Sequence, residues 1–166
     1  MKKRGLRLCE RLARRAAMLL MASGTVFALG GCSMLGLGGE KAKWTDVTFA
    51  ASDDVNNNSP VAVDVVLVSD ATLLARVAEM PASKWFAARD DLASTFPKGL
   101  RYLGWELVPG QHVRVSGEQF RGASVAGAFV FASYQDPGAH RVRVEHFSGH
   151  MVVKLDSNNL TVLDSK

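Results

Sequence analysis

Polar and apolar residues alternate over several short stretches in the second part of the chain. Residues 44–50 alternate and predict a first strand. Residues 61–68 are nearly all apolar and mostly β-branched, interrupted by Asp64, and predict a central strand buried on both faces. Further strands are predicted at residues 102–108, 111–117, 125–134, 140–147, 151–155 and 160–163. Short strands separated by turns are typical of an all-β sandwich.

One helical segment interrupts this pattern, between the second and third predicted strands. Asp70 is placed to cap a first helical stretch, and Pro81 to begin a second helix. The second helix carries four large side chains at three- and four-residue spacing: Trp85, Phe86, Arg89 and Leu92. Trp85 is expected in the core. The guanidinium of Arg89 could stack on an aromatic ring, but we favour the interpretation in which its aliphatic stem covers the core.

Two stretches carry turn-forming residues. Residues 52–60 form a polar loop rich in Asn and Asp, which tolerate left-handed backbone and hydrogen-bond their own main chain. Pro109-Gly110 lies between two predicted strands and predicts a hairpin.

The first 31 residues have the parts of a bacterial secretory signal. Seven basic residues open it: Lys2, Lys3, Arg4, Arg7, Arg11, Arg14 and Arg15. An apolar run follows over residues 16–28, and the segment ends in Leu29-Gly30-Gly31-Cys32. This ending resembles the bacterial lipobox, in which the Cys thiol receives a diacylglycerol and the new amino terminus is then acylated. The alternative, an uncleaved helical anchor, is disfavoured by the short apolar run and the glycines after it.

These observations divide the chain into three parts. We predict a signal peptide at residues 1–31, a flexible Gly-rich tether at residues 32–43, and a β-sandwich domain at residues 44–166. In enteric bacteria an Asp after the lipidated Cys resembles an inner-membrane retention signal. Ser33 therefore favours the outer membrane, with the domain facing the periplasm.

Removing the signal peptide changes the charge of the protein. The full chain carries a formal charge of +4, but its first 31 residues hold seven basic residues and one acidic residue, so the mature chain carries −2. The basic balance therefore gives no support to nucleic-acid binding. Cys9 leaves with the signal, so Cys32 is the only cysteine of the mature chain and no disulfide is predicted.

The candidate chemistry of the mature chain is sparse. His146 and His150 have the only metal-like spacing among four histidines, but their segment is predicted as two strands separated by Gly149, so surface histidines are the favoured interpretation. The sequence shows no nucleophile elbow, zinc-protease motif or phosphate loop. No metal or other cofactor is expected apart from the covalent lipid, and a binding or assembly role is favoured over an enzymatic one.

Several short segments resemble the type VI secretion lipoproteins, the TssJ or SciN family. Residues 56–63, Asn-Asn-Asn-Ser-Pro-Val-Ala-Val, are similar to the family's Asn…Ser-Pro-Val-Val-Val segment. Residues 107–110 resemble its Leu-x-Pro-Gly turn, and residues 125–134 resemble its Val- and Ala-rich strand. The segment around Trp85 departs from the family pattern, as does the end of the second strand at residues 66–68.

The resemblance implies a transthyretin-like β-sandwich with a helical insertion, anchored in the outer membrane. It implies binding to the periplasmic domain of the IcmF-like TssM subunit of the inner membrane. The family contact is a loop near the start of the sandwich. It matches eight residues here: Ser52, Asp53, Asp54, Val55, Asn56, Asn57, Asn58 and Ser59. A plain solvated turn is the alternative for this loop, and a periplasm-facing inhibitor or immunity lipoprotein is the alternative for the protein.

The predicted anchor can be tested by replacing Cys32 with Ala behind a secretory signal peptide that is removed independently of lipidation. We expect a folded domain that is released from membranes, since the acyl chains on Cys32 are the predicted attachment. Membrane fractionation measures this, and Cys9→Ala in the native chain is the control that should stay bound. A Cys32→Ala protein that sediments with membranes contradicts the prediction.

Overall fold

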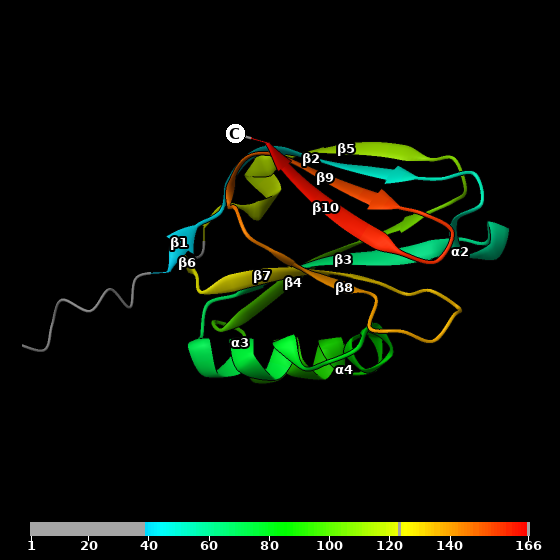
Figure 1. Ribbon diagram of the computed structural model, residues 1–166. Helices are drawn as coiled ribbons and strands as arrows, with labels where there is room; N and C mark the ends of the chain where they lie inside the picture. The colour runs from blue at the N-terminus through cyan, green and yellow to red at the C-terminus, as the bar shows by residue number, and fades with distance from the viewer. Residues whose placement is uncertain (1–38, 123, 166) are drawn as a thin grey trace, which may run out of the picture. The chain divides into compact units, whose positions relative to one another are not determined.

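Two four-stranded sheets face each other in the computed structural model, and two helices cover the outer face of one sheet (Figure 1). The structure describes residues 39–122 and 124–165. The first sheet, called the β2 sheet, has the order β10 (Leu160–Ser165), β9 (Ser148–Leu155), β2 (Lys43–Ala51) and β5 (His112–Ser116). The second, called the β3 sheet, has the order β4 (Leu100–Leu107), β3 (Val61–Val68), β7 (Gly127–Ala132) and β8 (Arg141–Val144). The predicted β-sandwich is confirmed.

The remaining elements are short or lie outside the two sheets. Strand β1 (Glu40–Lys41) pairs with β6 (Ser124–Val125) in a small ribbon of its own. Helices α3 (Ala71–Ala78) and α4 (Ala82–Thr95) form the insertion between β3 and β4, as predicted. A short turn, α2 (Val55–Asn58), lies in the β2–β3 loop, and a 3₁₀ turn, η1 (Gly117–Phe120), follows β5.

Strand β3 is buried on both faces, and this explains its nearly unbroken apolar sequence. Val63, Val65 and Leu67 belong to the core between the two sheets, whereas Val66 and Val68 belong to a second core beneath the helices. Successive side chains of a strand point to opposite faces, so a strand covered on both sides needs apolar residues at nearly every position.

The helices begin where the sequence predicts. The Asp70 carboxylate accepts a hydrogen bond from the Leu73 amide at 2.7 Å and caps α3. Pro81 lies immediately before α4, where a missing backbone N–H costs nothing. Among the described residues, no helix is long and apolar enough to cross a membrane.

Three details of the predicted organisation are corrected by the structure. The Pro109-Gly110 turn is not a hairpin, because β4 pairs with β3 whereas β5 pairs with β2, so the chain crosses from one sheet to the other there. A turn motif specifies a reversal of the chain, whereas the pairing partner is set by which face of each strand is apolar. Gly149 does not separate two strands but lies within β9, with φ of 79°, beside the register shift between β2 and β9.

The third correction concerns the predicted tether at residues 32–43. Strand β1 begins at Glu40 and β2 at Lys43, and the Ala42 side chain is buried in the core between the sheets. The folded domain therefore starts earlier than predicted, because Glu40 and Lys41 pair with β6 and Lys43 pairs with β9. The predicted signal peptide at residues 1–31, Cys32 and residues 33–38 lie outside the described residues.

A buried carboxylate joins the helical layer to the β3 sheet. The Asp64 side chain on β3 is 1% exposed, and it accepts hydrogen bonds from the Trp85 indole at 2.8 Å and from the Arg89 guanidinium at 2.8 and 3.0 Å. On the neighbouring strand, Gly104 leaves the room for this carboxylate, since a Cβ there would lie 2.5 Å from Asp64 Oδ1. The three side chains thus fix α4 on the sheet at one point.

Arg89 also stacks between two aromatic rings. Its guanidinium carbon lies 5.0 Å from the Phe86 ring centre and 5.3 Å from that of Tyr102. The stacked arrangement is thus the one observed, and the preference for a simple covering stem was wrong because Asp64 is the partner that holds the guanidinium in place. Burial raises the pKa of Asp64, and the hydrogen bonds from Arg89 and Trp85 act in the opposite direction.

Removing Arg89 should therefore leave a buried, poorly paired carboxylate. We expect Arg89→Met to lower the free energy of unfolding by about 2–4 kcal/mol, somewhat below the usual cost of breaking a fully buried pair because Arg89 is partly exposed. Urea denaturation at neutral pH measures this, with the exposed Arg76→Met on α3 as the control expected to change little.

Lowering the pH should narrow the difference in free energy of unfolding between the Arg89→Met variant and the wild type. The folded-state pKa of Asp64 is raised, so the native state takes up a proton on acidification before the unfolded state does. Protonation removes the charge that Arg89 balances, and the ion pair is then lost from the wild type as well. A difference that stays constant or widens as the pH falls through the acid range would show that Asp64 is not the partner that matters.

Candidate functional site

Four connections between strands meet at one end of the sandwich, which we call the loop end. They are the β2–β3 loop (residues 52–60), the β4–β5 turn (108–111), the β7–β8 loop (133–140) and the β9–β10 turn (156–159). Figure 1 shows α2 and these connections at one end of the two sheets, and β1 and β6 at the opposite end. Loops gathered at a sandwich end and held by rigid sheets are a common recognition surface.

Three consecutive asparagines make a left-handed turn at the centre of the β2–β3 loop. Asn56, Asn57 and Asn58 have φ angles of 47°, 56° and 59°. This conformation costs an ordinary residue about 1–2 kcal/mol, and Asn is among the residues that tolerate it best. The predicted left-handed tendency of this loop is thus confirmed, and α2 is not a right-handed helix.

The Asn56 side chain ties this turn to its surroundings. Its amide nitrogen donates to the Pro60 carbonyl at 2.7 Å, and its amide oxygen accepts from the Gln135 backbone N–H at 2.7 Å. Its own backbone N–H donates to the Ser157 carbonyl at 2.8 Å. One residue that is 3% exposed therefore connects the β2–β3 loop, the β7–β8 loop and the β9–β10 turn.

Further hydrogen bonds hold the edges of the loop end. The Gly110 N–H donates to the Ser52 carbonyl at 3.0 Å, which joins the β4–β5 turn to the start of the β2–β3 loop. The Tyr134 hydroxyl donates to the Asn159 carbonyl at 2.6 Å, and burial raises the pKa of this phenol. The hydroxyls of Ser52 and Ser157 donate to the Asp54 carboxylate and lower its pKa, Ser157 having the larger effect.

The eight predicted contact residues divide into those that reach solvent and those that support them. Val55 is fully buried in the core between the sheets, and Asn56 is buried in the junction described above. Neither presents a side chain to a partner in this arrangement, so their inclusion in the contact set is corrected to a supporting role. Four of the eight are exposed, namely Asp53, Asp54, Asn57 and Asn58, and Ser52 and Ser59 are partly exposed.

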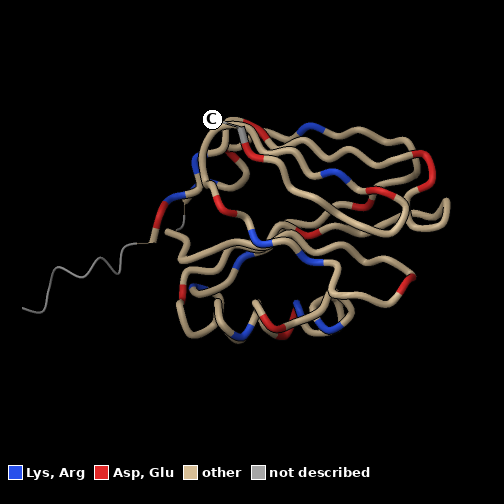
Figure 2. The backbone as a smooth tube through the Cα atoms, in the orientation of Figure 1, with Lys and Arg blue, Asp and Glu red and all other residues tan. Residues whose placement is uncertain are grey.

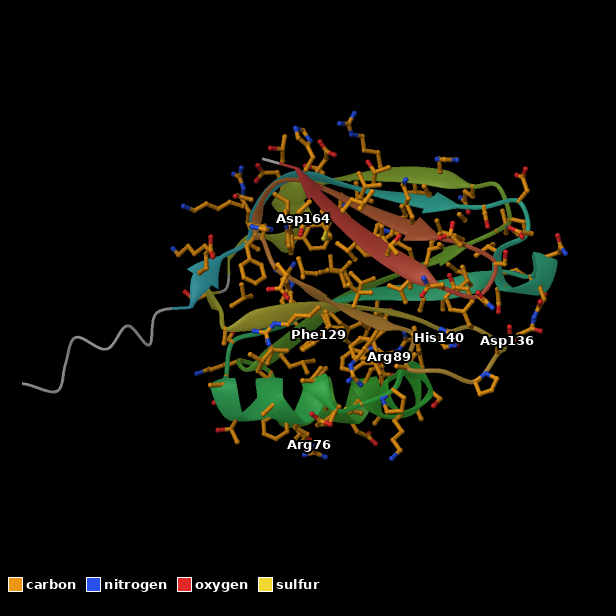
Figure 3. The ribbon with its side chains drawn as sticks, in the orientation of Figure 1. Arg76, Arg89, Phe129, Asp136, His140 and Asp164 are labelled. Carbon is orange, nitrogen blue, oxygen red and sulfur yellow. The ribbon has the colours of Figure 1, made fainter. Side chains whose placement is uncertain are left out.

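The loop end is acidic. Asp53, Asp54, Asp136 and Asp156 are all exposed there, and the four connecting segments contain no lysine or arginine. Figure 2 shows acidic positions in these loops, and Figure 3 shows Asp136 and His140 on the β7–β8 loop. The family resemblance indicated the β2–β3 loop alone. The participation of Gln135, Ser157 and Gly110 depends on contacts between segments far apart in the chain, which no local motif signals.

The candidate histidines lie elsewhere and pair with carboxylates. His150 Nδ1 lies 2.6 Å from Asp46 Oδ2, which also accepts from Arg114 at 2.9 Å. Arg114 is the main cause that lowers the pKa of Asp46. His146 Nδ1 lies 3.6 Å from Asp164 Oδ2. Within the described part of the chain, no group of three or more His, Cys, Asp or Glu side chains could hold a metal ion.

The fold was compared with those of known proteins. No protein-family model matches the sequence, and no curated protein matches it. Among solved structures, the type VI secretion lipoprotein TssJ1 from Pseudomonas aeruginosa aligns with a TM-score of 0.57 at 16% identity, over 73% of this chain and 95% of that chain. The fold is that of TssJ1.

Two further structures share this TssJ-like fold. A chain of a structure described as a type VI membrane complex aligns with a TM-score of 0.58 at 16% identity, over 74% of this chain and 98% of that chain. A chain of a structure described as the TssM C-terminal domain (869-1107) from EAEC aligns with a TM-score of 0.51 at 15% identity, over 72% of this chain and 97% of that chain.

The central role of Asn56 in the loop end can be tested by stability. We expect Asn56→Ala to lower the free energy of unfolding by about 2–4 kcal/mol, because it leaves buried polar groups unpaired and places Ala in a left-handed conformation. Thermal and urea unfolding measure this. Asn57→Ala is the matched control, since Asn57 has similar backbone angles but is exposed, and only the backbone cost should remain. Equal losses of unfolding free energy in the two variants would contradict the proposed role of the Asn56 side chain in joining the loops.

Proposed function

We propose that this protein is a lipid-anchored subunit of a type VI secretion membrane complex. The observation that carries the proposal is the TssJ-like fold, which aligns with 95% of the TssJ1 lipoprotein, on a chain whose first 32 residues end in a lipobox-like cysteine. The fold and the lipobox are independent features, and both belong to lipoproteins of this kind.

The proposed partner is a TssM-like inner-membrane subunit. Support comes from the structure described as a TssM C-terminal domain (869-1107), in which 72% of this 166-residue chain covers 97% of the matched chain. The matched chain is therefore about half as long as the range 869–1107 and is too short to be that whole domain. A chain of this length would fit a separate, TssJ-like protein bound to the TssM domain in the same structure.

We place the docking surface at the loop end. Its hydrogen bonds fix the backbone of four connections before any partner arrives, so little conformational entropy is lost on binding. Its exposed aspartates and asparagines present acceptors and negative charge, which favour a partner surface with basic and amide donors. The helices α3 and α4, fixed by the Asp64–Arg89 pair, lie on the outer face of the β3 sheet and are not part of this surface.

In this role the protein acts as a mechanical link rather than a catalyst. The acyl chains on Cys32 hold it to the periplasmic face of the outer membrane, and the loop end holds the inner-membrane subunit. The domain thereby ties the two membranes together around the secretion machine. The two attachments require only binding, which agrees with a site built from turns, backbone amides and carboxylates.

The proposal is tested by the affinity of the mature chain for the periplasmic C-terminal domain of the TssM-like subunit from the same bacterium. We expect Asp53→Arg/Asn58→Arg to weaken binding at least about tenfold, because both side chains are exposed on the docking loop. Isothermal titration calorimetry measures the dissociation constant.

A control with the same change in charge distinguishes the loss of a direct contact from an effect of the protein's overall charge. Ser83→Arg/Asp91→Arg adds the same positive charge on exposed positions of α4, and it should leave the affinity nearly unchanged. Equal weakening by both pairs would place the contact elsewhere than the loop end. A wild-type chain that does not bind the TssM-like domain would overturn the proposed function itself.

A further inference from the structure

The end of the domain opposite the loop end is basic on its exposed surface. We call it the tether end, because the described chain begins there at Gly39, beside β1 and β6 (Figure 1). Its exposed basic residues are Lys41, Lys43, Lys98, Arg101 and Arg121. Figure 2 shows basic positions, and one acidic position, next to the start of the described chain.

Three of these residues line one groove. Lys41, Lys43 and Arg121 surround a shallow groove of about 410 Å³ together with Ala42 and Gly122. Arg101 fixes the far wall of this groove, since its guanidinium donates to the Arg121 carbonyl at 3.0 Å and to the Gln119 carbonyl at 2.5 Å. Cations on three separate segments, β1, β2 and the turn after η1, are therefore gathered at one place.

The acidic residues of this end do not cancel its charge. Glu118 pairs with Arg121 at 2.7 Å, and Glu40 lies next to Lys41 on β1. Asp46 on β2 is buried and is bonded to Arg114 and His150. At the nearby ends of β8 and β10, Glu145 lies 4.0 Å from Arg143 and Asp164 lies 3.6 Å from His146. Lys41, Lys43, Arg101 and Arg121 thus outnumber Glu40 and Glu118 around this groove. The four connections of the loop end contain aspartates and no lysine or arginine.

An apolar groove lies at the same end of the β3 sheet. It has a volume of about 730 Å³ and lies between the start of α3 and the end of α4. Its lining includes the apolar Leu73, Phe96 and Pro97 and the charged Asp70, Arg76 and Lys98. The Phe96 side chain is 37% exposed, and Lys98 follows two residues later. The β3 end that leads into this groove is joined to the segment after β6, where the Ala126 N–H donates to the Val68 carbonyl at 2.7 Å. An exposed aromatic side chain beside lysine suits the boundary between lipid headgroups and acyl chains.

The position of the lipid makes a membrane the nearest large surface. Cys32 is seven residues before Gly39, and an extended chain rises by at most about 3.5 Å per residue, so the proposed acyl chains lie within roughly 25 Å of the tether end. A tether this short gives the surface a high effective concentration, so even weak attraction to headgroups has an effect.

We propose that the tether end rests on the anionic phospholipid headgroups of the membrane that holds the lipid anchor, and that this contact turns the acidic loop end away from the bilayer. The inference builds on the proposed lipid anchor. The lysines and arginines attract lipid phosphates, Phe96 inserts at the headgroup boundary, and the aspartates of the loop end are repelled by the same surface.

The test uses the unlipidated mature chain, residues 32–166 with Cys32→Ala, so that acyl chains contribute nothing. This chain contains the whole compact unit that begins at Gly38. Its partition onto sedimented vesicles of phosphatidylglycerol is compared with its partition onto vesicles of phosphatidylcholine. We expect binding to phosphatidylglycerol alone, lost at high salt, because exposed charges are screened there.

Two double variants locate the contact. Each basic residue near an anionic surface contributes about fivefold to binding, so Lys41→Glu/Lys43→Glu should lower the partition coefficient at least about twentyfold. Lys84→Glu/Lys154→Glu makes the same charge change at two exposed positions away from the tether end, and it should have little effect. Circular dichroism of both variants verifies that they are folded.

Either of two results overturns the inference: equal partition onto the two lipids, or equal losses in the two double variants. A negative result for headgroup binding can be distinguished from the absence of the proposed lipid anchor. Cys32 acylation is measured independently, by mass spectrometry of the protein from membranes, and the vesicle experiment omits it.

Discussion

The loop end depends on one buried amide. The Asn56 side chain accepts a hydrogen bond from the Gln135 backbone N–H and donates one to the Pro60 carbonyl. Its backbone is left-handed, a conformation that few other residues would tolerate. Its side chain supplies the hydrogen bond between the β2–β3 and β7–β8 loops, and the Ser157–Asp54 and Tyr134–Asn159 hydrogen bonds join each of these loops to the β9–β10 turn. The sandwich supplies a stiff base, but the shape of the proposed docking surface is set by this residue.

The two ends of the domain differ in charge and in the way they are built. At the loop end, exposed acceptors and aspartates rest on a network of backbone hydrogen bonds. At the tether end, basic side chains from β1, β2 and the turn after η1 surround a groove next to the point where the chain enters the fold. Such a division suits a protein that holds a membrane at one end and a protein partner at the other.

Much of the fold could be predicted from local patterns, but the site could be predicted only in part. The doubly buried strand β3, the Asp70 cap and the helical insertion follow from periodicity and capping chemistry, which are local. The crossing of the chain at Pro109-Gly110 and the pairing of Asp64 with Arg89 depend on which segments meet in space. The Asn-rich loop was identified from its residue types, whereas the burial of Val55 and Asn56 within it required the neighbouring loops.

Native-state amide hydrogen exchange, followed by NMR in the free mature chain and in the presence of the proposed TssM-like partner domain, tests the central claim most directly. In the free protein, the amides of Asn56 and Gln135 should exchange as slowly as those in the strands, because both are bonded within the junction. In the complex, the backbone amides of the exposed residues 57 and 58 should gain protection. Fast exchange of Gln135 in the free protein, or new protection confined to α3 and α4, would contradict the account.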